Sequence, residues 1–202
     1  MAGSAGRSCT DDEVRIVRVY DDKRAEPDDL VPMDGKTPGE IIIFPCFKST
    51  LTYPGNEELT KDKFYKGWIY THDLGTWDKN QFITVSGRKD DMIISSGENI
   101  YPAQVEEAIN CHPSVADCIV TAVPDKARGE AVVAYVIPKD DSLTIKDLNK
   151  YCANHPDLSA YKCPRFYCFV DKIPYNATGK KLHYVVKAQA PEDLEKGILQ
   201  KP

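Results

Sequence analysis

The N-terminal part of the chain alternates short apolar segments with turns. Residues 14–19 alternate apolar and polar side chains with period two, as a half-buried strand does. Residues 41–44 and 82–85 are short apolar runs of strand length, whereas residues 21–38 are acidic, contain proline and glycine, and predict a loop. Residues 57–64 predict one short helical turn. The pattern as a whole predicts a small β-rich unit.

From residue 87 onward the pattern changes to helices and strands in alternation. Pro102 suits a first helical turn, and Val105, Ala108 and Ile109 then form one apolar helix face. The same reasoning predicts strands over residues 115–123, 131–137 and 166–170, a helix capped by Thr144, and a last helix from Leu182. Three strands with helices between them predict a compact α/β layer.

The two patterns together predict an α+β fold. Residues 1–86 supply its β-rich part, and residues 87–202 supply an α/β domain with a three-stranded sheet and flanking helices. A chain of 202 residues can bury roughly 70% of its unfolded surface, so it can form a hydrophobic core without disulfides or metals.

Composition and charge exclude several classes of function. The net charge is −5 and lysines and arginines form no stripe, which argues against a nucleic-acid-binding protein. No apolar run is long enough to span a bilayer, and the N-terminus lacks the basic segment and apolar core of a secretory signal. The seven cysteines are odd in number and include no Cys-x-x-Cys pair, which is typical of reduced thiols, so we expect a cytoplasmic protein.

Four residues near the C-terminus have a spacing that zinc would accept, namely Cys152, His155, Cys163 and Cys168. Cys152 nevertheless falls on the apolar face of a predicted helix, and Cys168 falls inside a predicted apolar strand. Small buried hydrophobic side chains explain these cysteines better. We therefore predict no metal site.

The most informative segment covers residues 87–102. It places Arg88, the adjacent carboxylates Asp90 and Asp91, and Gly97 between a predicted strand and the helix that Pro102 begins. A turn with a purely structural role rarely needs so many charged residues. The segment resembles the hinge motif of the adenylate-forming superfamily, which includes acyl-CoA and aryl-CoA ligases and luciferases. The resemblance is specific because further matching motifs lie on both sides of it, in the family's order.

Residues 68–73 resemble the family's Trp-x-x-Thr-Gly-Asp segment, whose aspartate accepts hydrogen bonds from both ribose hydroxyls of the nucleotide. The resemblance therefore makes Asp73 a nucleotide ligand. Arg88 would be a second contact, because a planar guanidinium suits ribose or phosphate oxygens. His72 stands where the family has glycine, so any positive φ there falls to a histidine. Without the motif, Asp73 would only close a turn and Arg88 would be a solvated charge.

Within the hinge motif, Asp90 aligns with the residue about which the family's small domain rotates between two half-reactions. A short polar side chain can satisfy backbone donors in both conformations. Gly97 lies in the loop that, in the family, lines the pantetheine tunnel in the second half-reaction, where a missing Cβ permits close approach to a thin ligand. The alternative interpretations are a charged turn for Asp90 and a plain turn glycine for Gly97.

Residues 174–180 resemble the family's segment with the catalytic lysine. They do not form a Walker loop, because the first glycine is missing and Lys181 stands where Ser or Thr should follow. The resemblance gives Lys180 a place between the carboxylate being activated and the α-phosphate of ATP, where a cation offsets the repulsion of two anions. The neighbouring Lys181 is expected to point to solvent.

Three basic residues are candidates for binding the nucleotide phosphates of CoA. Lys162 and Arg165 belong to a segment that resembles the family's basic turn before the last strand, and Arg128 lies in an earlier loop.

The resemblance implies that this chain is the C-terminal portion of an AMP-forming ligase for a fatty or aromatic carboxylic acid. Such an enzyme forms an acyl-adenylate from the acid and ATP, and then transfers the acyl group to CoA with release of AMP. The phosphate loop, the Mg²⁺ ligands and the acid pocket are expected upstream, in an N-terminal domain that this chain begins too late to contain. We therefore expect the isolated chain to be inactive.

One alternative to a fragment of a ligase stays open at this point. The chain could be a stand-alone module that binds CoA, a nucleotide or a partner without catalysis. Its β-rich part, without the larger domain, would expose apolar strands and favour dimers.

Overall fold

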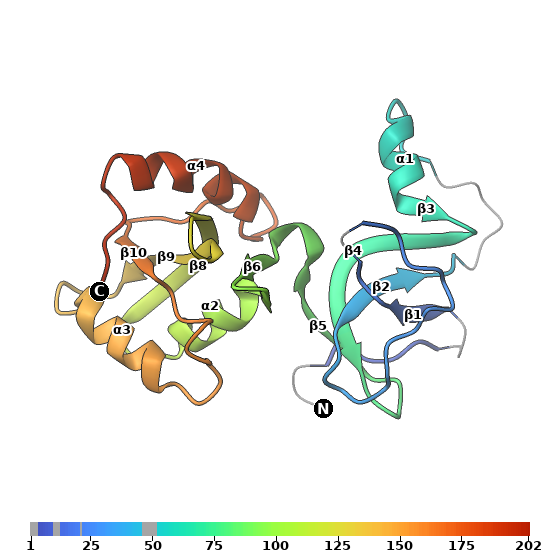
Figure 1. Cartoon of the computed structure of the whole chain (residues 1–202), viewed down its shortest axis with the longest axis horizontal. Helices are drawn as coiled ribbons and strands as arrows, with labels where there is room; N and C mark the ends of the chain where they lie inside the picture. The colour runs from blue at the N-terminus through green and yellow to red at the C-terminus, as the bar shows by residue number, and fades with distance from the viewer. Residues whose placement is uncertain (1–3, 10–12, 21, 46–51) are drawn as a thin grey trace. The chain divides into compact units, whose positions relative to one another are not determined.

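The computed structural model describes residues 4–9, 13–20, 22–45 and 52–202, so that residue 21 of the predicted loop 21–38 lies outside the described residues. The chain divides into two compact units, Met1–Asp90 and Asp91–Pro202 (Figure 1). The division therefore falls four residues later than a boundary after residue 86. Gly87 and Arg88 pair with β4 in the sheet of the first unit.

The first unit is an antiparallel five-stranded sheet. Its strands are β1 (Val14–Val17), β2 (Gly39–Ile43), β3 (Phe64–Tyr65), β4 (Trp68–Trp77) and β5 (Ile83–Arg88), and α1 (Glu57–Lys63) precedes β3. The long strand β4 pairs with β2, and it also pairs with β3 near its start and with β5 near its end.

Both faces of this sheet carry apolar side chains. Ile16 and Ile41 pack with Trp77 in one cluster, whereas Val17 and Ile42 pack with Trp68 and Tyr70 in another. Neighbouring residues of β1 and of β2 thus belong to different clusters, because successive side chains of a strand point to opposite faces of the sheet. Burial on both faces explains why the neighbouring residues Ile41 and Ile42 are both apolar, with no polar alternation.

The second unit contains a five-stranded sheet rather than the predicted three-stranded one. Its strands are β6 (Ile93–Ser95), β7 (Glu98–Ile100), β8 (Val115–Asp125), β9 (Gly129–Pro138) and β10 (Phe166–Phe169), and its helices are α2 (Pro102–Asn110), α3 (Ile145–Asn154) and α4 (His183–Glu195). The two additional strands form a short hairpin inside the hinge motif. Each has only three residues and most of their side chains are polar or exposed, so no apolar period marked them.

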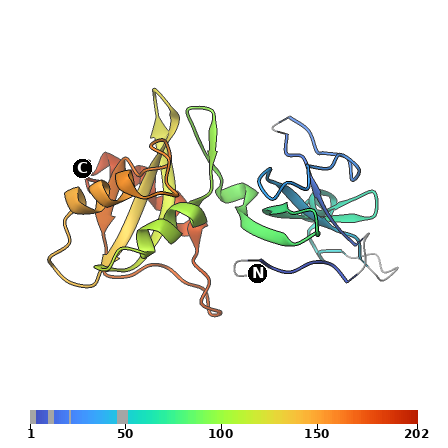
Figure 2. The ribbon, with the colours of Figure 1, turned by 90° about the horizontal axis from the view of Figure 1, so that it is seen from below.

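Strand β9 lies at the centre of this sheet and pairs antiparallel with β8, parallel with β10, and through Gly129 with β6. Helices α2 and α3 cover one face and α4 covers the other (Figures 1 and 2). The Thr144 hydroxyl accepts a hydrogen bond from the Asp147 amide (3.1 Å), which confirms the predicted cap of α3. The α+β fold class is confirmed.

Among the described residues, no helix has both the length and the apolar character that crossing a membrane requires.

Candidate functional site

Three residues of the predicted nucleotide-binding and hinge motifs come together in the first unit. Asp73 of β4 lies opposite Arg88 of β5 in the strand register. The Arg88 Nη1 atom lies 3.1 Å from Asp73 Oδ1, and its Nη2 atom lies 3.5 Å from Asp90 Oδ2. One guanidinium therefore joins the predicted ribose ligand to the predicted hinge residue. The side chains of Asp73 and Arg88 are both more than two-fifths exposed, so a ligand can reach them.

His72 has a φ of +62°, so a histidine adopts the left-handed conformation at the position where the family's motif has glycine. The strand is irregular here, because the pairing of β4 shifts register with β2 and again with β5. The imidazole contacts two carboxylates: Nε2 lies 3.2 Å from Asp62 Oδ2, and Nδ1 lies 3.5 Å from Asp90 Oδ2. A histidine thus holds the left-handed conformation while its ring contacts the carboxylate of Asp90, the predicted hinge residue.

Glu40 is a residue of this cluster that the sequence did not reveal. Its side chain is almost fully buried, and its carboxylate accepts hydrogen bonds from the His72 amide (3.2 Å) and from Lys89 Nζ (3.4 Å). Glu40 therefore links the irregular part of β4, at His72, to the segment that follows β5. A single glutamate at the start of an apolar run resembles an ordinary strand boundary, which is why the pattern gave no signal.

Lys180 lies on an exposed loop between β10 and α4, and Figure 2 shows this segment projecting as a narrow loop from the second unit. The side-chain oxygen of Asn176 braces the loop by accepting hydrogen bonds from the amides of Thr178 (3.0 Å) and Lys180 (2.8 Å). The Asn176 amide in turn donates to the Lys180 carbonyl (2.9 Å). The predicted catalytic lysine is therefore exposed on a loop with an ordered backbone.

Lys181 does not point to solvent as expected. Its Nζ atom lies 2.8 Å from Asp117 Oδ1 and 3.5 Å from Glu106 Oε2, and it donates to the carbonyl of Cys118. These partners belong to α2 and β8, against which the loop packs. The expectation failed because two carboxylates distant in sequence lie under the loop, and nothing local to residues 174–181 indicates them.

Glu106 is the buried centre of this network. It also accepts hydrogen bonds from the Val120 amide (2.8 Å), and its Oε1 lies 2.7 Å from Nε2 of His183, the first residue of α4. One sequence signal was present: Glu106 follows Val105 and lies one turn after Pro102, on the side of α2 that is buried. A carboxylate at such a position needs partners.

The pKa shifts of Lys181 and Asp117 agree with the close contact between their side chains. Burial alone would lower the pKa of Lys181, but its hydrogen bond to Asp117 and the charge of Glu106 outweigh burial, and the pKa is raised. Burial would raise the pKa of Asp117, yet its hydrogen bonds from Lys181 and Tyr175 lower it. Lys181 and Asp117 are thus held as an ion pair.

Gly97 lies at the tip of the β6–β7 hairpin, where Ser95 pairs with Glu98. Ser96 and Gly97 both have positive φ, +55° and +80°, as a tight two-residue hairpin turn requires. A Cβ built on Gly97 would meet no atom of the described residues within 4 Å, apart from those of its two chain neighbours. The predicted pantetheine-lining residue is therefore an open, exposed position whose backbone favours glycine.

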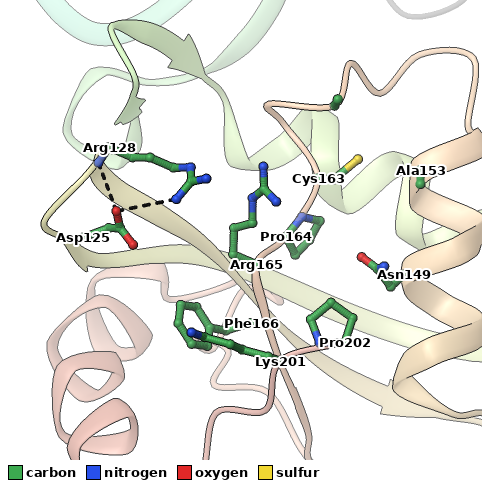
Figure 3. Close-up of a pocket in the computed structure, with 11 residues that line it drawn as sticks. Asp125, Arg128, Asn149, Ala153, Cys163, Pro164, Arg165, Phe166, Lys201 and Pro202 are labelled. Atoms are coloured by element: carbon green, nitrogen blue, oxygen red, sulfur yellow. Dashed lines mark hydrogen bonds and ion pairs between the residues drawn. The ribbon is translucent and has the colours of Figure 1, made fainter.

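Two of the three predicted CoA-binding residues share a pocket of about 500 Å³ in the second unit. Figure 3 shows the side chains of Arg128 and Arg165 extending toward one another at this pocket, with Phe166 and Lys201 along the same wall. Asp125 accepts hydrogen bonds from the Arg128 amide (2.9 Å) and lies 3.8 Å from its guanidinium. Lys162 does not line this pocket, because its Nζ donates to Gln104 (3.1 Å) beside a separate cavity.

The four residues with zinc-like spacing do not form a metal site. Cys152 and Cys163 lie in one hydrophobic cluster and Cys168 lies in the cluster on the other face of the sheet. Burial raises the pKa of Cys152 to about 11, which disfavours the thiolate that zinc requires. In the part of the chain that the structure describes, no group of three or more His, Cys, Asp or Glu side chains could hold a metal ion.

Comparisons with known proteins agree with the motifs. Residues 104–180 match the family described as AMP-binding enzyme C-terminal domain. A curated relative, the 2-succinylbenzoate–CoA ligase of Bacillus cereus, is 35% identical over 180 residues, which cover 89% of this chain and 34% of the relative. The chain thus spans about a third of the length of such relatives.

Solved structures give the same result. The o-succinylbenzoate CoA synthetase of Bacillus subtilis, in complex with its acyl-adenylate intermediate, is 34% identical with a TM-score of 0.75, and the match covers 92% of this chain and 35% of that one. The same enzyme has been solved with ATP and a magnesium ion. The anthranilate CoA ligase AuaEII, in complex with anthranoyl-AMP, is 26% identical with a TM-score of 0.79, covering 96% of this chain and 36% of that one.

Proposed function

Because this chain belongs to the adenylate-forming superfamily and matches the C-terminal portion of its members, we propose that it is part of an AMP-forming CoA ligase that acts on a carboxylic acid. In the first half-reaction a carboxylate oxygen attacks the α-phosphorus of ATP, and the bond to the leaving pyrophosphate breaks. In the second, the thiolate of CoA attacks the acyl carbon of the adenylate, and AMP leaves. The observation that carries the proposal is Lys180, the last residue of the family match, exposed on its braced loop.

Lys180 acts in the first half-reaction. The attacking carboxylate and the α-phosphate are both anions, and their repulsion is large where water is excluded. An ammonium group between them stabilises the charge that develops as the new bond forms. The preceding backbone is fixed by Asn176, so the lysine side chain is the mobile part that reaches the substrates.

Asp73 and Arg88 hold the nucleotide in both half-reactions. The Asp73 carboxylate accepts the ribose hydroxyl hydrogen bonds, and Arg88 contributes a planar donor beside it, 3.1 Å away. Their ion pair is exposed, so a nucleotide can replace it without uncovering a buried charge. We assign Mg²⁺ no ligand among the described residues.

Asp90 is the proposed hinge, and Gly97 the proposed contact for the pantetheine arm once the domain has rotated. The Gly97 tip has no side chain, so a thin ligand can approach its backbone closely. For the nucleotide end of CoA we propose the pocket that Arg128 and Arg165 share, since two guanidinium groups suit its phosphates. Lys162 would join them only after releasing Gln104.

The alternative function, a binding module without catalysis, is favoured by one observation. The basic pocket lies wholly within the second unit, so CoA binding there needs no other part of the protein. The ligase proposal requires in addition that the pocket serves a reaction whose acid site and phosphate loop lie elsewhere in the complete protein.

The test compares the complete protein with the 202-residue chain. Each is incubated with ATP, Mg²⁺, CoA and one acid, and pyrophosphate and thioester are measured. We expect the complete protein to release both products when the acid is present. We expect the 202-residue chain alone to release neither. The names of the relatives make 2-succinylbenzoate and anthranilate the first acids to try, with a long-chain fatty acid beside them. CoA binding without acid-dependent pyrophosphate from the complete protein would favour the binding module.

A further inference from the structure

The side chains of Lys180 and Lys181 leave their loop in different directions. Lys181 forms an isolated antiparallel bridge with Tyr175. The backbone bonds on either side of this bridge run from the Asn176 amide to the Lys180 carbonyl (2.9 Å) and from the Leu182 amide to the Pro174 carbonyl (3.0 Å). This is the geometry of a β-ladder, in which consecutive side chains point to opposite faces.

On the inner face of this ladder, the side chains of both strands contact the same carboxylate. Residues paired across an antiparallel bridge project their side chains to the same face. Tyr175 and Lys181 obey this rule, because the Tyr175 hydroxyl donates to Asp117 Oδ2 while Lys181 Nζ lies 2.8 Å from Asp117 Oδ1. Both strands of the loop are therefore attached to a single carboxylate on β8.

The attachment of Lys181 is partly buried. Its side chain is 19% exposed, and the second carboxylate within its reach, Glu106, is 10% exposed. Glu106 is itself held by the Val120 amide and by His183 at the start of α4. Removing the Lys181 charge would leave Asp117 and Glu106 close together without the cation between them, which costs more than losing an exposed ion pair.

We propose that Lys181 is the positioning residue for Lys180. By anchoring to Asp117 and Glu106, it fixes which face of the loop turns inward, and Lys180 is thereby held outward toward the substrates. This inference rests on the proposed function of Lys180. It gives Lys181, Asp117 and Glu106 a role in adenylation although none of them touches a substrate.

The test measures both half-reactions in the complete protein. Lys181→Met keeps the length of the side chain but removes its charge, and Asp117→Asn weakens the same attachment from the other side. A misplaced catalytic group can slow a reaction by about 10- to 100-fold, so we expect losses of that size in acyl-adenylate formation from acid and ATP. Thioester formation from pre-made acyl-adenylate and CoA should stay at the unmodified rate. Lys146→Met, the same chemical change at an exposed position of α3, is the matched control.

Two measurements separate positioning from mere folding. Lys181→Arg keeps a cation that can bond to Asp117 and should restore adenylation. In the 202-residue chain, Lys181→Met should speed hydrogen exchange at the Lys180 and Asn176 amides, whose acceptors lie within the loop, while Lys146→Met leaves it unchanged. A structural role alone would slow both half-reactions in proportion to the unfolded fraction, and that result overturns the proposal.

Lys180→Ala separates the proposed function of Lys180 from the positioning role of Lys181. If this variant keeps full adenylation, the proposed function of Lys180 fails. If it loses adenylation while Lys181→Met keeps it, only the positioning role fails. If Lys181→Met is the more damaging of the two and loop exchange is unchanged, Lys181 is itself the catalytic cation and the positioning proposal is wrong.

Discussion

His72 has a strained backbone conformation beside the proposed site, and its side chain makes contacts there. A left-handed backbone costs an L-residue about 1–2 kcal/mol, and glycine avoids this cost. The chain nevertheless has histidine at φ +62°, with its ring between the carboxylates of Asp62 and Asp90. The contacts of the ring compensate for the backbone, and they connect α1 to the segment that contains the proposed hinge.

Two substitutions separate these contributions. His72→Gly and His72→Ala both remove the ring, but only glycine relieves the positive φ. We expect the glycine variant to be more stable than the alanine variant by about 1 kcal/mol. Both tryptophans of the chain, Trp68 and Trp77, lie in β4, so tryptophan fluorescence during urea unfolding reports on the first unit alone. Equal stability of the two variants would show that the backbone at residue 72 is not strained.

The residues of the proposed site were only partly predictable. Asp73, Arg88 and Asp90 belong to two motifs, and the structure brings them within one cluster because β4 and β5 are neighbours. Glu40 and Glu106 escaped prediction, since a buried carboxylate is recognised by partners that are remote in sequence. The catalytic roles of Asp73, Arg88, Asp90, Gly97 and Lys180 stay predictions.

At the scale of elements, α4 is fastened to α2 through a titratable pair. His183 begins α4, and its ring contacts Glu106 of α2 at 2.7 Å. Burial, the largest influence, lowers the pKa of His183, but the hydrogen bond and the charge of Glu106 together outweigh it, so the pKa is raised above 6.5. Asp91 raises it further and Lys181 lowers it.

This pair makes the stability of the second unit depend on pH. A group whose pKa is raised on folding binds its proton more tightly in the folded state, so its contribution is complete below the unfolded pKa of about 6.5 and is lost as the pH rises through the folded value. We expect the free energy of unfolding to fall over that window, and His183→Gln to remove this component. His155→Gln, in the same unit, is the control. Circular dichroism during urea unfolding measures it, and an unchanged pH dependence in His183→Gln would contradict the assignment.

The elements divide into those with a clear apolar period and those without one. Strands β8 and β9 and helix α3 were predicted because long apolar segments or a capped amphipathic pattern mark them. Strand β4 was not predicted as a strand, because Thr71, His72 and Asp73 interrupt its apolar residues with polar ones. Strands β6 and β7 were hidden for the same reason, because Ser95, Glu98 and Asn99 leave them without an apolar period.

At the scale of the whole molecule, the two units differ in how helices cover their sheets, because α1 of the first unit has no buried residue. In the second unit helices cover both faces of the sheet. In the first unit Ile43, Phe44 and Val85 are each between about a third and a half exposed, near strand ends and edges. Relatives are about three times as long as this chain, and we expect their additional domain to cover such positions.

Limited proteolysis tests the independence of the second unit. Trypsin can cleave after Arg88 and Lys89, which lie where the two units meet in sequence. We expect early cleavage there and a stable product that contains residues 91–202, because the clusters of that unit are internally complete. Early cuts spread through residues 100–190 would contradict an independently folded unit.

Association of the isolated chain tests the exposed apolar positions of the first unit. Exposed strand edges and apolar patches favour self-association. We expect light scattering to show dimers or larger species as concentration rises, and a dye for apolar surfaces to bind. The paired variant Phe44→Ser and Val85→Thr should reduce both signals. A clean monomer at all concentrations, with no dye binding, would contradict the expectation.

The central claim is that one domain presents Lys180 for adenylation and Gly97 for thioester formation, and comparing the two half-reactions in the complete protein tests it most directly. Lys180→Ala should slow acyl-adenylate formation by roughly 10²–10³-fold, the scale of losing one preorganised charge-stabilising group, and spare thioester formation from pre-made adenylate. Gly97→Trp should do the reverse, with Gly97→Ala as the control that carries the same backbone strain without the bulk. Opposite losses in the two variants are the predicted result. Equal losses of both steps in Lys180→Ala would contradict the account.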